Sequence, residues 1–205
     1  MSLPQNPGHK LYFAYGSNLS STQMKARCLS AVPVGLGHLP GWTWIINQRG
    51  YANIVQGSSN PAATATATAT AGAAATATST VSETEGAGVY GVLYTLPPID
   101  EAALDRCEHV PTAYEKATLD VEVVAARGAA DGEANEYTQF EQTQLPALVY
   151  VDYHRVEADR PKAEYIARMN RGIDEARRDY GLPEWYITNV MRPFIKPKEL
   201  TEETA

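Results

Sequence analysis

The sequence is short of cysteine, of positive charge and of long apolar runs, and each shortage excludes a class of protein. Its 205 residues include two cysteines, Cys28 and Cys107, and the first ten residues, MSLPQNPGHK, lack the apolar stretch that a secretion signal requires. Both features favour a reducing compartment, so we expect a cytoplasmic protein. No apolar run approaches the roughly 20 residues of a membrane-spanning helix, and we expect no membrane partner.

Positive charge is scarce as well. The chain carries 24 acidic and 17 basic residues, which gives a formal net charge of −7. This balance leaves no basic face rich enough to neutralise the phosphates of a nucleic acid. We therefore expect a small-molecule partner and no nucleic acid. The sequence leaves the oligomeric state open, a homodimer included.

Side chains that bind metals are present, but not at the spacings of a metal site. The four histidines show no metal-type spacing with one another or with the cysteines: His9, His38, His109 and His154. The phosphate-binding patterns GxxxxGK and GxGxxG do not occur either. We expect no metal and no other cofactor.

What the chain does contain is enough apolar material, 44% of its residues, for one domain over residues 1–205. Aromatic and β-branched runs punctuated by glycine predict strands with bends, and Gly91 indicates a bend or a close neighbour. The expected strands are residues 11–15, 31–39, 41–55, 88–96, 114–127 and 145–153, with a polar loop at about 127–144 between the last two.

Three segments carry helix signals. Ser and Thr before QMKAR predict a short helix that ends near Arg27. Pro98 and the acidic residues after it predict a helix that ends near Glu108, with Ala103, Leu104 and Cys107 as its apolar stripe. A longer helix is expected from Pro161 to Gly181, with a buried face made by five residues: Ile166, Met169, Ile173, Ala176 and Tyr180. The fold class is mixed α/β (α+β), with most strands in a curved or closed sheet.

One segment departs from this pattern. From about 57 to 87 the chain is an Ala-Thr repeat without large apolar residues, so it has nothing to contribute to a core. A solvated insertion is the favoured interpretation, and a functional lid or a loose edge strand is the alternative.

Two features carry chemistry. The first is YGSN, Tyr15 to Asn18, where a strand breaks into a sharp loop ahead of a helix. Successive N–H groups in such a loop suit a carboxylate or a developing oxyanion, although a simple turn uses the same residues. Ser17 as a nucleophile ranks last, because it lies outside a GxSxG elbow and no base is evident.

The second feature is Glu108, at the end of an amphipathic helix. If its carboxylate points inward, the helix dipole and desolvation both raise its pKa from about 4.3, which suits proton transfer near neutral pH. The alternative is a solvated charge at a helix end. Asp105 competes for the role, but an Asp within a short helix more often faces water.

Several segments together resemble the γ-glutamylcyclotransferase (AIG2-like) family. They are YFAYGSNL, GYANI, VYGVLYTL, LDRCEHVPTAYEK, VYVDY and PKAEYIARMNRGIDEARRDYGLP. Their order and separations match as well, and the resemblance covers residues 11–56 and 88–195 without the Ala-Thr segment.

The resemblance implies a small β-barrel flanked by helices, with a cavity beside the barrel. It implies that Tyr15, Gly16, Ser17 and Asn18 hold a γ-glutamyl group through backbone amides and that Glu108 is the catalytic acid/base. The other substrate-binding residues that it implies are Tyr12, Phe13, Ala14, Tyr150 and Tyr165. The family usually has Gly after the catalytic Glu, whereas this chain has His109, so the turn, the substrate or the pKa of Glu108 can differ.

The reaction implied is cyclisation of a γ-glutamyl group to 5-oxoproline, with release of an amino acid, peptide or amine and without a cofactor. Two alternatives stay open. One is a noncatalytic module of the same fold that binds γ-glutamyl ligands. The other is a cyclotransferase dedicated to glutathione adducts in secondary metabolism.

Overall fold

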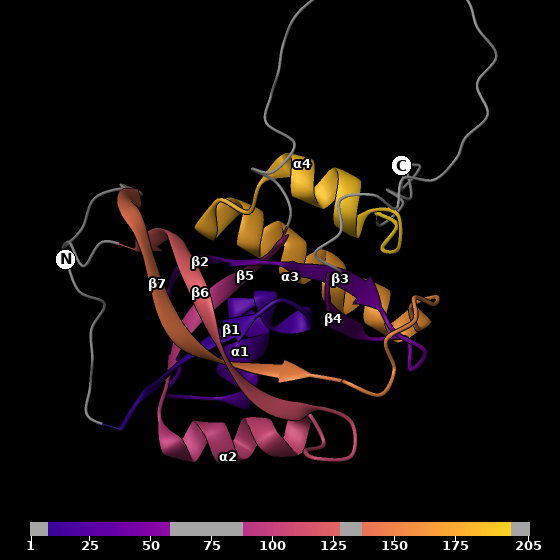
Figure 1. Cartoon of the computed structure of the whole chain (residues 1–205), viewed down its shortest axis with the longest axis horizontal. Coiled ribbons are helices and arrows are strands. Elements are labelled where there is room, and N and C mark those ends of the chain that lie inside the picture. Colours follow the sequence, from indigo (N-terminus) through magenta and orange to yellow (C-terminus); the bar gives the residue numbers. More distant parts are fainter. Residues whose placement is uncertain (1–7, 58–87, 128–136, 198–205) are drawn as a thin grey trace, which may run out of the picture.

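The computed structural model describes residues 8–57, 88–127 and 137–197. In this part of the chain five strands close into a barrel, which confirms the predicted mixed fold (Figure 1). Around the barrel the strands follow the order β1 (Lys10–Ala14), β5 (Gly88–Leu96), β2 (Val32–Pro40), β6 (Glu115–Arg127) and β7 (Tyr137–Val151). Neighbours are antiparallel except β1 and β7, whose parallel pairing of Tyr12 with Leu148 closes the ring.

Glycines allow the barrel strands to bend and to pack closely. The register of β2 shifts once against β5 and once against β6, each time beside a glycine, as the sequence predicted. Gly91 of β5 has β1 as its close neighbour. A Cβ atom at Gly91 would lie 2.8 Å from the Phe13 ring and 2.7 Å from the Ala14 carbonyl oxygen. Gly91 therefore lets β5 approach the strand that leads into YGSN.

A two-stranded sheet lies beside the barrel. It consists of β3 (Trp42–Ile46) and β4 (Ala52–Gln56), which are antiparallel and joined by a short turn. The indole of Trp44 is buried and donates a hydrogen bond of 3.0 Å to the carbonyl oxygen of Tyr15. This bond ties the small sheet to the end of β1.

Capping residues lie at two of the helix ends that the sequence predicted. The helices are α1 (Ser21–Arg27), α2 (Pro98–Cys107), α3 (Ala163–Tyr180) and α4 (Glu184–Tyr186), with a 3₁₀ turn at Ser17–Leu19 and a π-helical turn at Ile187–Met191. Ser20 caps α1, because its Oγ accepts a hydrogen bond of 3.0 Å from the Gln23 N–H. Gly181 ends α3 with φ at 72°, which glycine adopts without strain.

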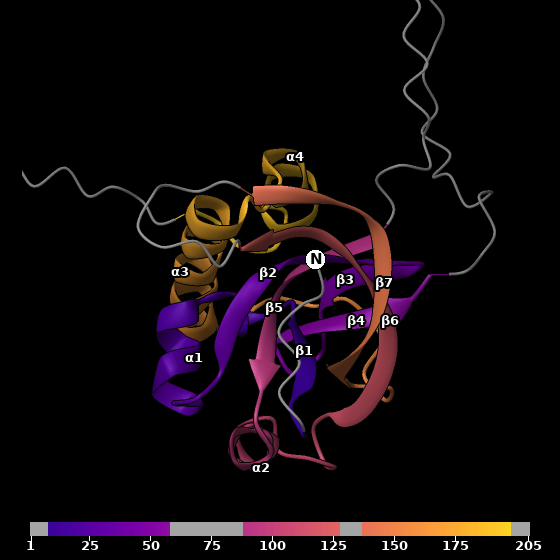
Figure 2. The ribbon, with the colours of Figure 1, turned by 90° about the vertical axis from the view of Figure 1, so that its left-hand side faces the viewer.

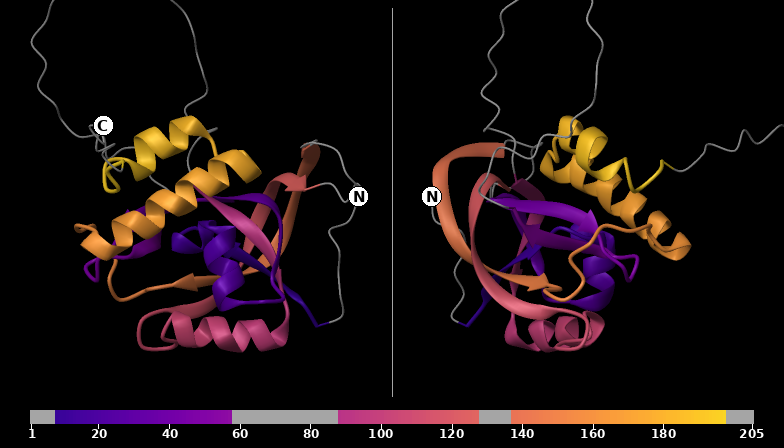
Figure 3. Two further views of the ribbon diagram at one scale, coloured as in Figure 1. Left: turned by 180° about the vertical axis from the view of Figure 1, so that it is seen from behind. Right: turned by 45° about the vertical axis from the view of Figure 1, so that its right-hand side comes forward.

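The helices flank the barrel on opposite sides. Figures 1 and 3 show α2 along the bottom of the molecule and α3 with α4 along the top. Figure 2 shows α1 next to α3 on the flank of the barrel. In the described ranges, no helix combines the length and the apolar character needed to cross a membrane.

Several expectations need correction. β7 already begins at Tyr137, so the polar loop predicted at 127–144 is wrong for 137–144, where the backbone pairs with β6. The long helix begins two residues after Pro161, and the segment predicted as strand at 41–55 is two strands, β3 and β4, separated by a turn. The helical segment at 184–191 was not predicted. Cys107 is exposed rather than part of a buried stripe, although Leu104 is fully buried. The Ala-Thr segment, apart from Gly57, lies outside the described residues.

The buried face of α3 agrees with its predicted pattern. Four of its five predicted residues are buried, and Ile166 is partly buried. They join the side chains of the barrel strands in one hydrophobic cluster, which fixes α3 against the loop that follows β1.

Candidate active site

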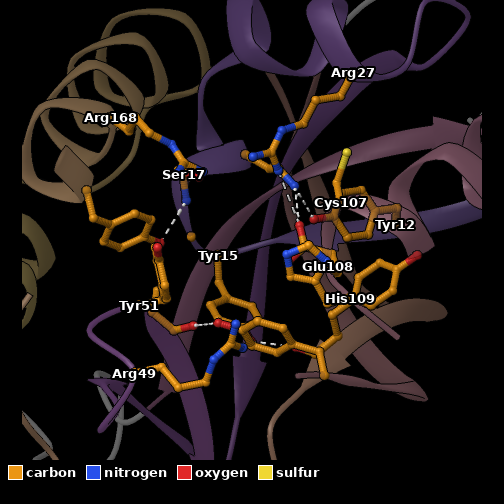
Figure 4. Close-up of a pocket in the computed structure, with 16 residues that line it drawn as sticks. Tyr12, Tyr15, Ser17, Arg27, Arg49, Tyr51, Cys107, Glu108, His109 and Arg168 are labelled. Carbon is orange, nitrogen blue, oxygen red and sulfur yellow. Dashed lines mark hydrogen bonds and ion pairs between the residues drawn. The ribbon is translucent and has the colours of Figure 1, made fainter. Parts of the chain in front are cut away.

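A cavity of about 290 Å³ lies where β1, the β3–β4 turn and the ends of α1, α2 and α3 meet (Figure 4). Its lining is aromatic and polar, with six tyrosines and three arginines around a single carboxylate. The lining residues are Tyr12, Tyr15, Gly16, Ser17, Asn18, Arg27, Arg49, Tyr51, Ala52, Cys107, Glu108, His109, Tyr114, Tyr150, Tyr165 and Arg168.

Most of the predicted site residues meet in this cavity. Tyr12, Tyr150 and Tyr165, the four residues of YGSN and Glu108 all line it, although they come from four separate parts of the chain. Phe13 and Ala14 do not. Both are almost completely buried, and the Phe13 ring packs against Gly91 on the neighbouring strand. Their side chains therefore belong to the core rather than to the cavity.

The end of α2 places Glu108. The N–H of His109 donates to the Arg106 carbonyl at 3.3 Å, and the N–H of Val110 donates to the Asp105 carbonyl at 3.0 Å. This pair of bonds is a Schellman motif, in which the residue after the cap takes a left-handed conformation. His109 does so, with φ at 53°. The usual glycine is thus replaced by His109, and the helix still ends in a left-handed turn.

The Glu108 carboxyl lies inside the site rather than in bulk water, with its side chain 18% exposed. Its Oε1 accepts hydrogen bonds from Asn18 Nδ2 at 3.2 Å and Arg27 Nη1 at 3.4 Å (Figure 4). Burial raises the pKa of Glu108 above its usual range, while Arg27 and Asn18 partly oppose that shift. Its Oε2 has no hydrogen bond to any described residue and is available to a substrate.

Asp105 has a different role. Its carboxylate accepts hydrogen bonds from Lys116 Nζ at 2.8 Å and from the Tyr150 hydroxyl at 2.7 Å. Partial burial would raise the pKa of Asp105, but these two donors outweigh it and lower the pKa. Asp105 therefore stays ionised and holds Tyr150 in place, and it does not line the cavity.

The YGSN loop is held close to α3. Ser17 N–H donates to the Tyr165 hydroxyl oxygen at 3.2 Å, and a Cβ atom at Gly16 would lie 3.0 Å from the same oxygen. Ser17 Oγ accepts hydrogen bonds of 2.8 Å from Gln23 Nε2 and from Arg168 Nη2. Because its oxygen faces two donors and no base, Ser17 is a poor nucleophile. The acceptor of the Ser17 N–H in this structure is the Tyr165 hydroxyl oxygen.

Burial keeps three tyrosines of the cavity, Tyr12, Tyr15 and Tyr165, in the neutral form. Burial raises the pKa of Tyr165 to about 12 and also raises the pKa of Tyr12 and Tyr15. The Tyr12 hydroxyl oxygen accepts from Asn18 Nδ2 at 2.9 Å, so its proton can be donated elsewhere. Tyr15 donates to the carbonyl oxygen of Tyr150. These bonds fix the rings around Glu108.

The three arginines of the cavity were not predicted from the sequence. Arg27 comes from α1, Arg49 from the β3–β4 turn and Arg168 from α3. Tyr51 and Tyr114 were not predicted either, although both lie within segments that carry the family resemblance, GYANI and LDRCEHVPTAYEK. In the residues that the structure describes, no group of three or more His, Cys, Asp or Glu side chains could hold a metal ion.

Comparisons with known structures agree with the fold. A structure of an uncharacterized protein from Homo sapiens is 19% identical, with a TM-score of 0.60, and covers 97% of this chain and 94% of its own. A structure named gamma-glutamyl cyclotransferase is 19% identical, with a TM-score of 0.60 and coverage of 96% and 94%. YkqA from Bacillus subtilis is also 19% identical, with a TM-score of 0.57, and covers 93% of this chain and 56% of its own.

Identity this low shows a shared fold and not a shared activity. No curated protein sequence matches this chain. The model of the AIG2-like family matches residues 88–190, which is slightly more than half of the chain. The chain therefore belongs to the AIG2-like family and has the fold of a γ-glutamyl cyclotransferase.

Proposed function

We propose that this protein is a γ-glutamylcyclotransferase, which converts a γ-glutamyl compound into 5-oxoproline and a free amine. The observation that carries the proposal is the Glu108 carboxyl, which is partly desolvated and faces YGSN in a cavity of about 290 Å³. Its raised pKa suits a group that takes and returns a proton near neutral pH.

The substrate would supply its own nucleophile. Oε2 of Glu108 takes a proton from the α-ammonium group, and the resulting amine attacks the γ-carbonyl carbon. The new C–N bond closes a five-membered ring, and the original amide C–N bond breaks. One ammonium proton stays on the ring nitrogen. The other two reach the leaving nitrogen, and Glu108 acts as the general acid toward that nitrogen. Because the reaction is intramolecular, alignment alone gives effective molarities on the order of 10⁵ M.

The remaining groups of the site would support this chemistry. Asn18 and Arg27 hold Oε1 of Glu108, so that Oε2 is turned to the substrate. Neutral tyrosine hydroxyls and the loop N–H groups can donate to the oxyanion that forms on the γ-carbonyl. Three arginines against one carboxylate make the cavity positive, which suits a substrate with a net negative charge.

The test is release of 5-oxoproline from γ-glutamyl-alanine by the purified protein and by Glu108→Gln. We expect kcat/KM of Glu108→Gln to fall by about 10²- to 10⁴-fold, the usual contribution of a general acid/base. Glu184→Gln, at an exposed position of α4, is the control and should keep wild-type activity. Near-wild-type turnover by Glu108→Gln would remove Glu108 from the mechanism.

The pH dependence supplies a second readout. Activity requires ionised Glu108, and burial raises its pKa, so the acid limb of kcat/KM should lie above about pH 4.3. Because the pKa of Glu108 is raised on folding, its ionisation at pH 7 lowers the free energy of unfolding, so Glu108→Gln should melt at pH 7 no lower than wild type. Binding of γ-glutamyl-alanine without turnover would instead support a noncatalytic module. Turnover of glutathione adducts alone would support a dedicated enzyme.

A further inference from the structure

We infer that Arg49 forms a carboxylate-binding subsite for the group that leaves, and that this residue sets the preference of the chain for γ-glutamyl amino acids over γ-glutamyl amines. This inference rests on the proposed function and narrows it. It starts from a cation that lines the cavity and has no partner for its charge among the residues that the structure describes.

Backbone contacts fix the turn that carries Arg49. Asn47 accepts hydrogen bonds from the Arg49 N–H through Oδ1, at 3.0 Å, and from the Gly50 N–H through its carbonyl, at 2.8 Å. Gly50 has φ at 82°, and its carbonyl accepts from the Lys162 N–H at 3.2 Å. A Cβ atom at Gly50 would lie 2.9 Å from that nitrogen, so only glycine fits. Arg49 is thus held before a ligand arrives, which reduces the entropic cost of binding.

The guanidinium group of Arg49 lies over two aromatic rings. Its central carbon is 5.6 Å from the ring centroid of Tyr51 and 5.6 Å from that of Tyr114. These contacts leave the edge of the guanidinium, where its N–H donors lie, uncommitted. Nη1 is buried and has no hydrogen-bond partner among the described residues. An unmet buried donor is costly, and a ligand carboxylate would satisfy it with a charged hydrogen bond.

The other two arginines of the cavity already have acidic partners. Arg27 Nη1 lies 3.4 Å from Glu108 Oε1, and Arg168 Nη1 lies 3.3 Å from Glu164 Oε2. Arg49 forms no ion pair in the part of the chain that the structure describes. Among the three arginines of the cavity, it is therefore Arg49 whose charge has no acidic partner in the described residues.

The position of Arg49 assigns its carboxylate to the leaving group. Arg27 and Arg168 lie on the same side of the cavity as YGSN, which the proposed mechanism gives to the glutamyl group. Figure 4 shows Arg49 on the other side, below Tyr15, in the direction that leads away from Ser17 and Arg168. A γ-glutamyl amino acid has a carboxylate at each end, and the cavity would then have a cation at each end.

The experiment compares γ-glutamyl-alanine with γ-glutamyl-ethylamine, which differ only in the carboxylate of the leaving group. We expect wild type to prefer γ-glutamyl-alanine by about 10- to 100-fold in kcat/KM, the worth of one charged hydrogen bond. Arg49→Met should lose this preference through a higher KM for γ-glutamyl-alanine, with γ-glutamyl-ethylamine unaffected. Arg49→Lys should keep part of it. Lys162→Met is the matched control, because its Nζ lies 4.9 Å from the Tyr51 ring but Lys162 does not line the cavity.

Three outcomes would overturn the subsite. They are no preference in wild type, an unchanged preference in Arg49→Met, and equal losses of both substrates in Arg49→Met. The last would place Arg49 at the glutamyl group or in the fold. If wild type cyclises neither compound, the proposed function fails, and calorimetric titration with both compounds still decides the subsite. The subsite is supported if wild type binds γ-glutamyl-alanine more tightly than γ-glutamyl-ethylamine and Arg49→Met loses this difference. It is refuted if wild type binds the two compounds equally.

Discussion

His109 holds a left-handed backbone conformation directly after the residue that we propose as the acid/base. Its φ of 53° is unfavourable for a residue with a Cβ atom, and the two Schellman hydrogen bonds at the end of α2 keep it there. Its carbonyl oxygen adds a third restraint, since it accepts from the Ala113 N–H at 2.9 Å. The turn that aims Glu108 is therefore retained at a cost in backbone strain.

This strain predicts an order of stability for two substitutions. The free energy of unfolding of His109→Gly should be about 1 kcal/mol higher than that of His109→Ala. Both changes remove the same imidazole, but only glycine adopts positive φ without strain. Urea denaturation at pH 7 measures the difference, and far-ultraviolet circular dichroism checks that both variants are folded. If the Ala variant equals or exceeds the Gly variant, the turn is not strained at His109.

At the same scale, sequence reasoning located some site residues and not others. Glu108 and the YGSN loop were predictable, because each belongs to a short motif whose neighbours in the chain set its geometry. Arg49 was not predictable, because its proposed role depends on two aromatic rings from distant parts of the chain. They are Tyr51, directly before β4, and Tyr114, directly before β6. Phe13 and Ala14 were assigned to the site through their place in a motif, and the sequence does not show that their side chains turn into the core.

Among the elements, α3 and α1 are joined through a buried carboxylate. Glu175 of α3 is 7% exposed, and its Oε2 accepts hydrogen bonds from the N–H of Thr22 and from the hydroxyls of Ser20 and Ser21 at 3.0 to 3.3 Å. An acidic group at the first turn of α1 also complements its dipole. Since α1 carries Arg27 and α3 carries Tyr165 and Arg168, this junction connects the two helices that contribute these lining residues.

Glu175→Gln should therefore destabilise the fold in a pH-dependent way. Burial opposes ionisation, but the three donors outweigh it and lower the pKa of Glu175. A lowered pKa adds stability that is present above the unfolded pKa and is lost as pH falls through the folded value. We expect Glu175→Gln to cost about 1–3 kcal/mol at pH 7, with a smaller difference below about pH 4.

Urea denaturation of both proteins at several pH values measures this difference. Asp174→Asn, the exposed neighbour on α3, is the control and should change stability by less than about 0.5 kcal/mol. A Gln variant as stable as wild type at pH 7 would show that the junction contributes nothing.

Element prediction failed where polar residues form regular structure. Residues 137–144 are mostly polar and were expected to form a loop, yet their backbone pairs with β6, because backbone N–H and C=O groups need hydrogen-bond partners whatever side chains they carry. By contrast, α3 was predictable nearly to the residue, because its apolar positions recur at the helical period and Gly181 ends it. Barrel closure through β1 and β7 is a tertiary pairing that no local pattern specifies.

At the scale of the whole molecule, the two described residues at the ends of the Ala-Thr segment, Gly57 and Gly88, are both held at the connection between β2 and β3. Gly57 N–H donates to the Gly41 carbonyl at 2.8 Å, and Gly88 pairs with Pro40. Both ends are therefore anchored at Pro40 and Gly41, between β2 and β3. Neither end lines the cavity. A linker of a few residues can consequently replace the segment without moving β4 or β5.

Deletion of residues 60–84 should leave the fold and the proposed activity intact. It joins Gly57 to Gly88 through the five residues SSEGA, which can span up to about 17 Å. Shortening the loop should leave the free energy of unfolding unchanged or raise it by up to about 1.5 kcal/mol, because closing a shorter loop costs less entropy.

Melting temperature and release of 5-oxoproline from γ-glutamyl-alanine measure the two effects, with a variant that scrambles the Ala-Thr order as the control. A drop of several degrees in the deletion variant would show that the segment packs on the fold, and lost turnover at an unchanged melting temperature would support the alternative of a lid.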